Sequence, residues 1–153
     1  MSEVFDVLID QPFFEGMTDD QVRAVAETAR LVTFEEGAVM FVEGGPARRT
    51  YLILDGDVAL SLRTQEHGAK VIQTLHRGDF VGWSWMYPPY RWSFDANVQS
   101  EVTAVQLDGP QLKKISLADP ELGYELLRRF TEVIVTRMQA LRIQLLDVYS
   151  AFR

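Results

Sequence analysis

Between Val22 and Ala29 the apolar residues recur at helical spacing. The stretch from Thr18 to Gln21 precedes them and has the form of a capping box, in which a threonine and a glutamine three residues later satisfy the first backbone N–H groups of a helix. We therefore expect a short amphipathic helix from Thr18 to about Arg30.

The pattern changes in residues 31–107, where short apolar runs alternate with glycine-containing turn signals. Turn signals at intervals of roughly ten residues are typical of an antiparallel sandwich or barrel. The clearest run is TYLILDGDVALSL, residues 50–62. It predicts a β-hairpin in which Asp55-Gly56 supplies the positive φ of a tight turn.

After Gly109-Pro110 the helical pattern returns and continues to the end of the chain, with two apolar rows. One row alternates steps of four and three, as a heptad seam does; it comprises Leu127, Thr131, Ile134, Met138, Leu141, Leu145 and Val148. The neighbouring row is expected to lie on the β-domain; it comprises Leu122, Leu126, Phe130 and Val133. We predict that the first row is a homodimer interface, formed by Ile134, Met138, Leu141, Leu145 and Val148. The alternative is a single wide face directed at the core.

Composition narrows the class of protein. The 153 residues suffice for one domain, and 47% hydrophobic with 24% charged residues is ordinary for a globular chain. A net charge of −7 argues against DNA as a partner, because affinity for a phosphate backbone depends on positive charge. No apolar run is long enough to span a membrane, and the N-terminus is acidic. We expect a cytoplasmic protein without a membrane partner.

Few residues of the chain suit catalysis or metal binding. There is no cysteine, and neither His67 nor His76 begins the His-x-carboxylate pair that a metal-dependent oxygenase needs. No Ser-His-Asp arrangement or paired-carboxylate motif can be assigned. We therefore expect no catalytic residues, no metal and no cofactor, and a protein that is not an enzyme.

The densest feature is GDFVGWSWMYPPYRWSFDANV, residues 78–98, which holds three tryptophans, two tyrosines and two phenylalanines. Its opening, GDFVG (78–82), resembles the entry to the phosphate-binding cassette of the cyclic-nucleotide-binding domain. GAVMFVEGG (37–45) and YLILDGDVAL (51–60) resemble two earlier glycine signatures of that family, in the family's order. The chain is most similar to the effector domain of the cyclic-AMP receptor protein and FNR-type bacterial regulators.

The resemblance implies a mainly β fold with flanking helices. It is a double-stranded β-helix, or jelly roll, with short N-terminal helices and a long C-terminal dimerisation helix. We accordingly divide the single domain into a helical segment (1–30), a β-roll (31–108) and a C-terminal helix (110–153).

In the family, a glutamate after the cassette glycine holds the ribose, and an arginine pairs with the cyclic phosphate. Here Trp83 follows Gly82, and Trp92 precedes the matching Ser93, so tryptophan replaces both anchors. Each lost charged hydrogen bond is worth about 1.5–3 kcal/mol, which makes ordinary cyclic-nucleotide binding unfavourable. Arg91 lies one residue from the matched position, and in an extended segment that shift turns a side chain to the opposite face. The alternative is that the Pro88-Pro89 pair changes the local register, so that Arg91 reaches an anion.

Three interpretations of the aromatic stretch remain open. The tryptophans fill the former nucleotide pocket, or they line a pocket for another ligand, or the Pro-Pro-Tyr-Arg-Trp edge meets a protein partner. The candidate ligand-binding residues of this divergent cassette are Gly82, Trp83, Ser84, Trp85, Arg91, Trp92 and Ser93.

Relatives of this kind continue into a winged helix-turn-helix, whereas this sequence stops at Arg153. We therefore expect a stand-alone regulatory or adaptor module that does not bind DNA. It would act as a homodimer on an unidentified protein partner, alone or in a larger complex. The alternative is a small-molecule sensor that uses the aromatic cassette, for a cyclic nucleotide or for another anionic or aromatic ligand.

Overall fold

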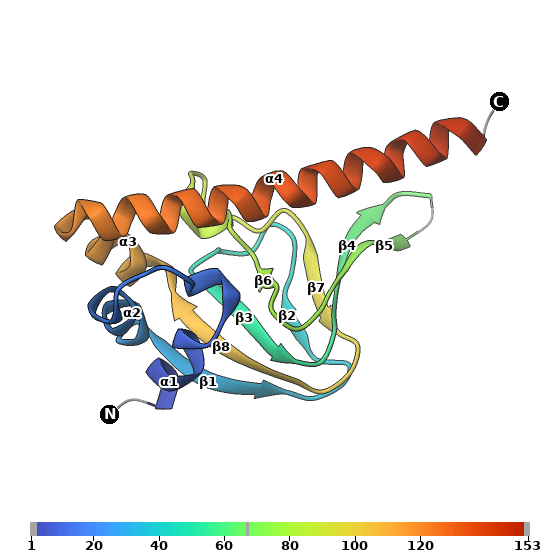
Figure 1. Ribbon diagram of the computed structural model, residues 1–153. Helices are drawn as coiled ribbons and strands as arrows, with labels where there is room; N and C mark the ends of the chain where they lie inside the picture. The colour runs from blue at the N-terminus through green and yellow to red at the C-terminus, as the bar shows by residue number, and fades with distance from the viewer. Residues whose placement is uncertain (1–2, 67, 152–153) are drawn as a thin grey trace.

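The computed structural model describes residues 3–66 and 68–151, with side chains through residue 147. Within these residues the strands form two four-stranded antiparallel sheets (Figure 1). Sheet A has the order β1 (Ala29–Phe34), β8 (Val102–Asp108), β3 (Arg49–Asp55), β6 (Phe80–Val81). Sheet B has the order β2 (Val39–Phe41), β7 (Asp95–Val98), β4 (Val58–Thr64), β5 (Gly68–Leu75). This arrangement is the predicted jelly roll.

Helices precede, interrupt and follow the strands (Figure 1). Their bounds are α1 (Glu3–Ile9), η1 (Pro12–Phe14), α2 (Asp19–Ala26), η2 (Ser84–Met86), α3 (Gly109–Ala118) and α4 (Pro120–Ala151). The expected single helix over 110–153 is thus two helices, which meet at Asp119. Asp119 has an extended backbone and caps α4 by accepting from the backbone N–H of Leu122, so the chain changes direction there.

The central strands of sheet A, β3 and β8, place buried side chains on both faces of the sheet, since successive side chains of a strand point to opposite sides. In β3, Tyr51 and Ile53 contribute to the inner core between the sheets, and Leu52 to the outer core against the helices. In β8, Ala104 joins the inner core and Val105 the outer core. The fold therefore has a helical layer, sheet A and sheet B in succession.

The predicted hairpin over residues 50–62 is wrong. Its two strands, β3 and β4, lie in different sheets, and the Asp55-Gly56 turn carries the chain from one sheet to the other. The turn bonds to the β7–β8 connection instead: Asp57 N donates to Ser100 Oγ at 3.0 Å, and Gln99 N donates to Asp57 O at 2.9 Å. A local pattern identifies a turn but not the partner of each strand. The hairpin that does form joins β4 to β5.

The Thr18 capping box is confirmed, since Thr18 and Gln21 exchange both side-chain-to-backbone hydrogen bonds. The helix ends at Ala26 rather than near Arg30, because β1 already begins at Ala29, where it pairs with Leu107 of β8. The helical spacing of apolar residues runs on to Ala29 in the sequence, but in the structure Ala29 already pairs with β8.

The two apolar rows of α4 differ in burial. Leu122, Leu126 and Phe130 are buried in the outer core, and Val133 is half-buried. The heptad row is open to solvent at Leu127 (48% exposed), Thr131, Met138 (60%) and Leu145 (54%), and half-buried at Ile134 and Leu141. The side chain of Val148 lies outside the described residues. Figure 1 shows the red end of α4 reaching beyond the sheets, and among the described residues Met138 and Leu145 of this row stay more than half exposed.

Gly56 provides a test of the turn that carries the chain from sheet A to sheet B. Its φ is +93°, and an added Cβ would overlap the backbone carbonyl of Glu101. Gly37 has a similar φ of +88° but nothing within 4 Å of an added Cβ. We expect Gly37→Ala to cost about 1–2 kcal/mol from backbone strain alone and Gly56→Ala to cost a further ~1–3 kcal/mol from overpacking. Urea unfolding measures both, and equal losses would contradict the packed turn.

Candidate ligand cassette

The cassette, residues 82–94, connects β6 to β7 and is tied by hydrogen bonds at both ends. At its start, Thr50 Oγ1 donates to the carbonyl oxygen of Gly82 at 2.8 Å. At its end, Trp92 N donates to Gly45 O at 2.9 Å, and Gly44 N donates to Trp92 O at 2.8 Å. The β2–β3 loop, which carries the first glycine signature, therefore holds the end of the cassette in place.

Trp92 fills the space between the cassette glycine and sheet B. Its side chain belongs to the inner core, is only 7% exposed and stacks on Phe41 at a centroid distance of 3.7 Å and an interplanar angle of 10°. Gly82, with φ +92°, faces the same ring, and an added Cβ there would overlap it. The absence of a side chain at Gly82 is what allows the indole to lie so close.

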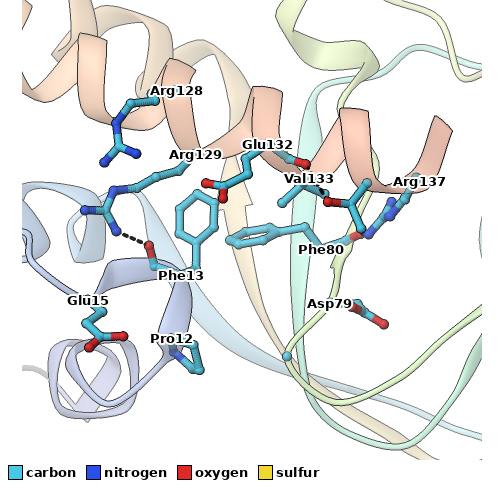
Figure 2. Close-up of a pocket in the computed structure, with 12 residues that line it drawn as sticks. Pro12, Phe13, Glu15, Asp79, Phe80, Arg128, Arg129, Glu132, Val133 and Arg137 are labelled. Carbon is cyan, nitrogen blue, oxygen red and sulfur yellow. Dashed lines mark hydrogen bonds between the residues drawn. The ribbon is translucent and has the colours of Figure 1, made fainter. Parts of the chain in front are cut away.

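Trp83 contacts α4 through Arg137. The guanidinium carbon of Arg137 lies 5.0 Å from the centroid of the Trp83 ring, and Arg137 also donates to the carbonyl oxygen of Phe80. Figure 2 shows this side chain reaching from α4 toward Phe80. Arg137 is 5% exposed, and burial lowers its pKa to about 10, partly opposed by the charge of Asp79. Its Nη1 has no hydrogen-bond partner among the described atoms.

Trp85 points to the other side of sheet A. It is 5% exposed in the outer core, where its ring meets Phe130 of α4 edge-on at 5.4 Å. Trp83 immediately precedes η2 and Trp85 lies within it. The tight 3₁₀ turn between them directs the two rings to different sides. The three tryptophans therefore occupy three separate environments and do not pack together in one pocket.

Comparison with known proteins agrees with this geometry. A model of the cyclic nucleotide-binding domain matches residues 31–119. The chain belongs to the cyclic nucleotide-binding domain family. A CRP-like cAMP-activated global transcriptional regulator of Mycobacterium tuberculosis is 25% identical over 143 residues, which are 94% of this chain. The chain spans 62% of the length of that relative.

Solved structures share the fold. A cyclic nucleotide-binding protein of Geobacter metallireducens superposes with a TM-score of 0.79 at 25% identity, covering 90% of this chain and 99% of the other. A cyclic nucleotide-binding domain of Methylobacillus flagellatus gives a TM-score of 0.81 at 18% identity, covering 94% of this chain and 81% of the other. Both likenesses extend past the matched domain into the flanking helices.

Within this cyclic nucleotide-binding domain, the polar residues of the cassette face outward or remain peripheral. Arg91 is exposed and donates from Nη1 to Gly44 O at 2.9 Å, so its guanidinium lies on the face opposite buried Trp92. Ser93 is exposed and Ser84 is half-buried in η2. The cassette thus brings no positive side chain to the space between Gly82 and Phe41.

Asp95 is a buried carboxylate that the sequence reasoning missed. It accepts from the backbone N–H of Glu43 at 2.7 Å and from Arg63 Nε at 3.0 Å. The Glu43 hydrogen bond lowers the pKa of Asp95, burial opposes this, and Arg63 adds to the lowering. The three residues lie far apart in the sequence, so no local motif could indicate this link between the β2–β3 loop and sheet B.

A cleft of about 480 Å³ lies between η1, the β5–β6 turn and α4 (Figure 2). The positive charges of the arginines that line it equal the negative charges of its carboxylates. Arg128 and Arg129 also both pair with Glu125. Its charged residues are Arg128, Arg129, Arg137, Glu15, Asp79 and Glu132. This balance gives the cleft no excess charge with which to select an anion.

Two negative findings apply to the described residues. No group of three or more His, Cys, Asp or Glu side chains comes together there in a way that could hold a metal ion. None of the helices in that part of the chain has the length and apolarity required to cross a membrane.

The packing of Trp92 predicts a strong effect on stability. Trp92→Ala should lower the free energy of unfolding by about 3–5 kcal/mol, because it empties space in the inner core. Trp83 is half-buried, so Trp83→Ala should cost less, about 1–2 kcal/mol. Urea denaturation followed by circular dichroism measures both losses. A loss at Trp92 no larger than that at Trp83 would contradict the packing described.

Proposed function

We propose that this domain is a regulatory module that does not bind cyclic nucleotides in the family's usual way and that acts through protein contacts. The observation that carries the proposal is the Trp92 ring, buried between Gly82 and Phe41. The side chain at the family's arginine position is here part of the hydrophobic core. A ligand phosphate would have to displace that ring.

Electrostatics support the same conclusion. A cyclic phosphate loses its hydration on binding and needs charged donors in return, each worth about 1.5–3 kcal/mol. Arg91 is directed at Gly44 on the outer surface, and the buried Arg137 already contacts Phe80 and the Trp83 ring. With Trp83 at the family's glutamate position, the ribose hydroxyl also lacks its carboxylate acceptor.

The exposed row of α4 supports a homodimer. Met138 and Leu145 are each more than half exposed, in heptad register. Apolar side chains that repeat along one helix face in this way are stabilised by a second helix. We propose that two copies pair along α4 and that the dimer presents its surface to a protein partner.

The matched protein of M. tuberculosis is named a transcriptional regulator, which supports a regulatory, non-catalytic role for this domain in the cytoplasm. The net charge of −7 supports a protein partner rather than DNA.

Calorimetric titration with cyclic AMP and cyclic GMP tests the proposal. We expect no saturable heat with either nucleotide at millimolar concentration, because the ring of Trp92 occupies the space and the cassette itself brings no cation to face it. The cAMP-activated regulator of M. tuberculosis provides the positive control in the same buffer. A micromolar dissociation constant for either nucleotide would refute the proposal.

Sedimentation equilibrium tests the dimer. Met138→Glu places a charge in the seam and should shift the protein to monomer. Ile143→Glu is the matched control, since Ile143 (59% exposed) is as open as Met138 (60%) on the same helix but lies outside the heptad row. Dissociation by both variants alike, or a wild-type protein that is already monomeric, would exclude α4 as the specific interface.

A further inference from the structure

An aromatic groove lies on the outer side of the cassette, between η2, α3 and α4. It has a volume of about 510 Å³, within the range of small-molecule sites. Trp85 and Tyr90 of the cassette line one side, and Tyr124 and Phe130 of α4 line the other. Neither Trp92 nor Gly82 is among its lining residues, so the groove is separate from the family's nucleotide position.

The walls of the groove are apolar and partly open to water. Leu117 of α3 is 85% exposed, and on α4 Tyr124 is 64% and Leu127 48% exposed. Apolar surface of this kind, concave and lined by rings, is the usual environment of an apolar ligand body. The groove therefore suits a small molecule with an aromatic or aliphatic body.

One positive charge distinguishes this groove from the cleft of Figure 2. Lys113 of α3 is the only charged residue among those that line it, and its Nζ lies 3.5 Å from the centroid of the Tyr90 ring. Within the described part of the chain, Lys113 forms no ion pair with a carboxylate. In a chain with a net charge of −7, an unneutralised lysine over an aromatic wall favours a ligand with one anionic group.

Trp85 supplies a second, independent observation. Its indole Nε1 is buried and has no hydrogen-bond acceptor among the described atoms. Buried N–H groups in native proteins almost always have an acceptor, so an unpaired one needs a partner that the chain itself does not provide. An oxygen atom of a ligand seated against Trp85 would serve once the ring turns toward the groove, because Nε1 is closed to solvent in this arrangement.

We propose that the aromatic groove binds a small carboxylate whose apolar body lies against Trp85, Tyr124 and Phe130. Its carboxylate pairs with Lys113, and a ligand oxygen accepts from the Trp85 indole. Because Trp85 and Tyr90 belong to the cassette while Lys113 and Tyr124 belong to α3 and α4, the bound ligand joins these elements and stabilises one arrangement of them. This site goes beyond the proposed function and does not depend on it.

In the first experiment the nitrogen-labelled full chain is titrated with naphthoate, and NMR monitors its tryptophan indole N–H signals. The three tryptophans give separate indole N–H signals, which single Trp→Phe variants assign. We expect a saturable downfield shift of the Trp85 signal with a dissociation constant of about 1 mM or below. The Trp92 signal should not move, because that ring lies in the inner core.

The second experiment compares Lys113→Met with Lys114→Met. Lys114 is the adjacent residue, exposed and outside the groove. Loss of the Lys113 charge should weaken naphthoate binding about twofold to fivefold, whereas Lys114→Met should leave it unchanged. The neutral analogue naphthylmethanol should bind wild-type protein and Lys113→Met equally. Circular dichroism establishes that both variants are folded.

Three results would overturn the proposal: no saturable shift at Trp85, equal weakening by the two lysine variants, or binding only to the monomeric Met138→Glu protein. The last result would identify a second copy of the chain as the occupant of the groove. Cyclic nucleotide binding would instead perturb Trp92 and refute the proposed function alone, so the two failures are distinguishable.

Discussion

Sheet A must bury both of its faces, and the positions of the other elements depend on this constraint. Alternate residues of β3 and β8 supply an inner core toward sheet B and an outer core toward the helices. The cassette follows the edge strand β6 and contributes a ring to each core, Trp92 on one side and Trp85 on the other. The aromatic density of this segment therefore reflects two hydrophobic cores that meet at one edge of a sheet.

The same arrangement connects the cassette to α4 at two points. Trp85 packs edge-on against Phe130, and Trp83 lies under the guanidinium of Arg137. The first contact is apolar. The second keeps the Arg137 cation away from water with few hydrogen bonds, and this desolvation costs folding free energy. A shift of the cassette would disturb both contacts, so the cassette and α4 constrain each other's position.

Much of the fold could be predicted from local patterns. The Thr18 capping box, the turn at Gly56 and the two rows of α4 each follow from residues close in sequence, and the glycine signatures indicated the jelly roll. Strand pairing could not be predicted, because the pattern of β3 and β4 fits a hairpin as well as a crossing between sheets. Arg137 was missed because a search for a heptad seam looks for apolar residues. The separation of Trp83, Trp85 and Trp92 depends on the local path of η2.

The fit of Trp92 against Gly82 limits which side chains position 92 accepts. A single change from Trp92 to arginine would remove the stacking partner of Phe41 and introduce a charge into the inner core. That intermediate would lose stability before any nucleotide could compensate. An arginine at this position would thus need compensating substitutions around it, because the ring of Trp92 is one of the side chains that hold the inner core together.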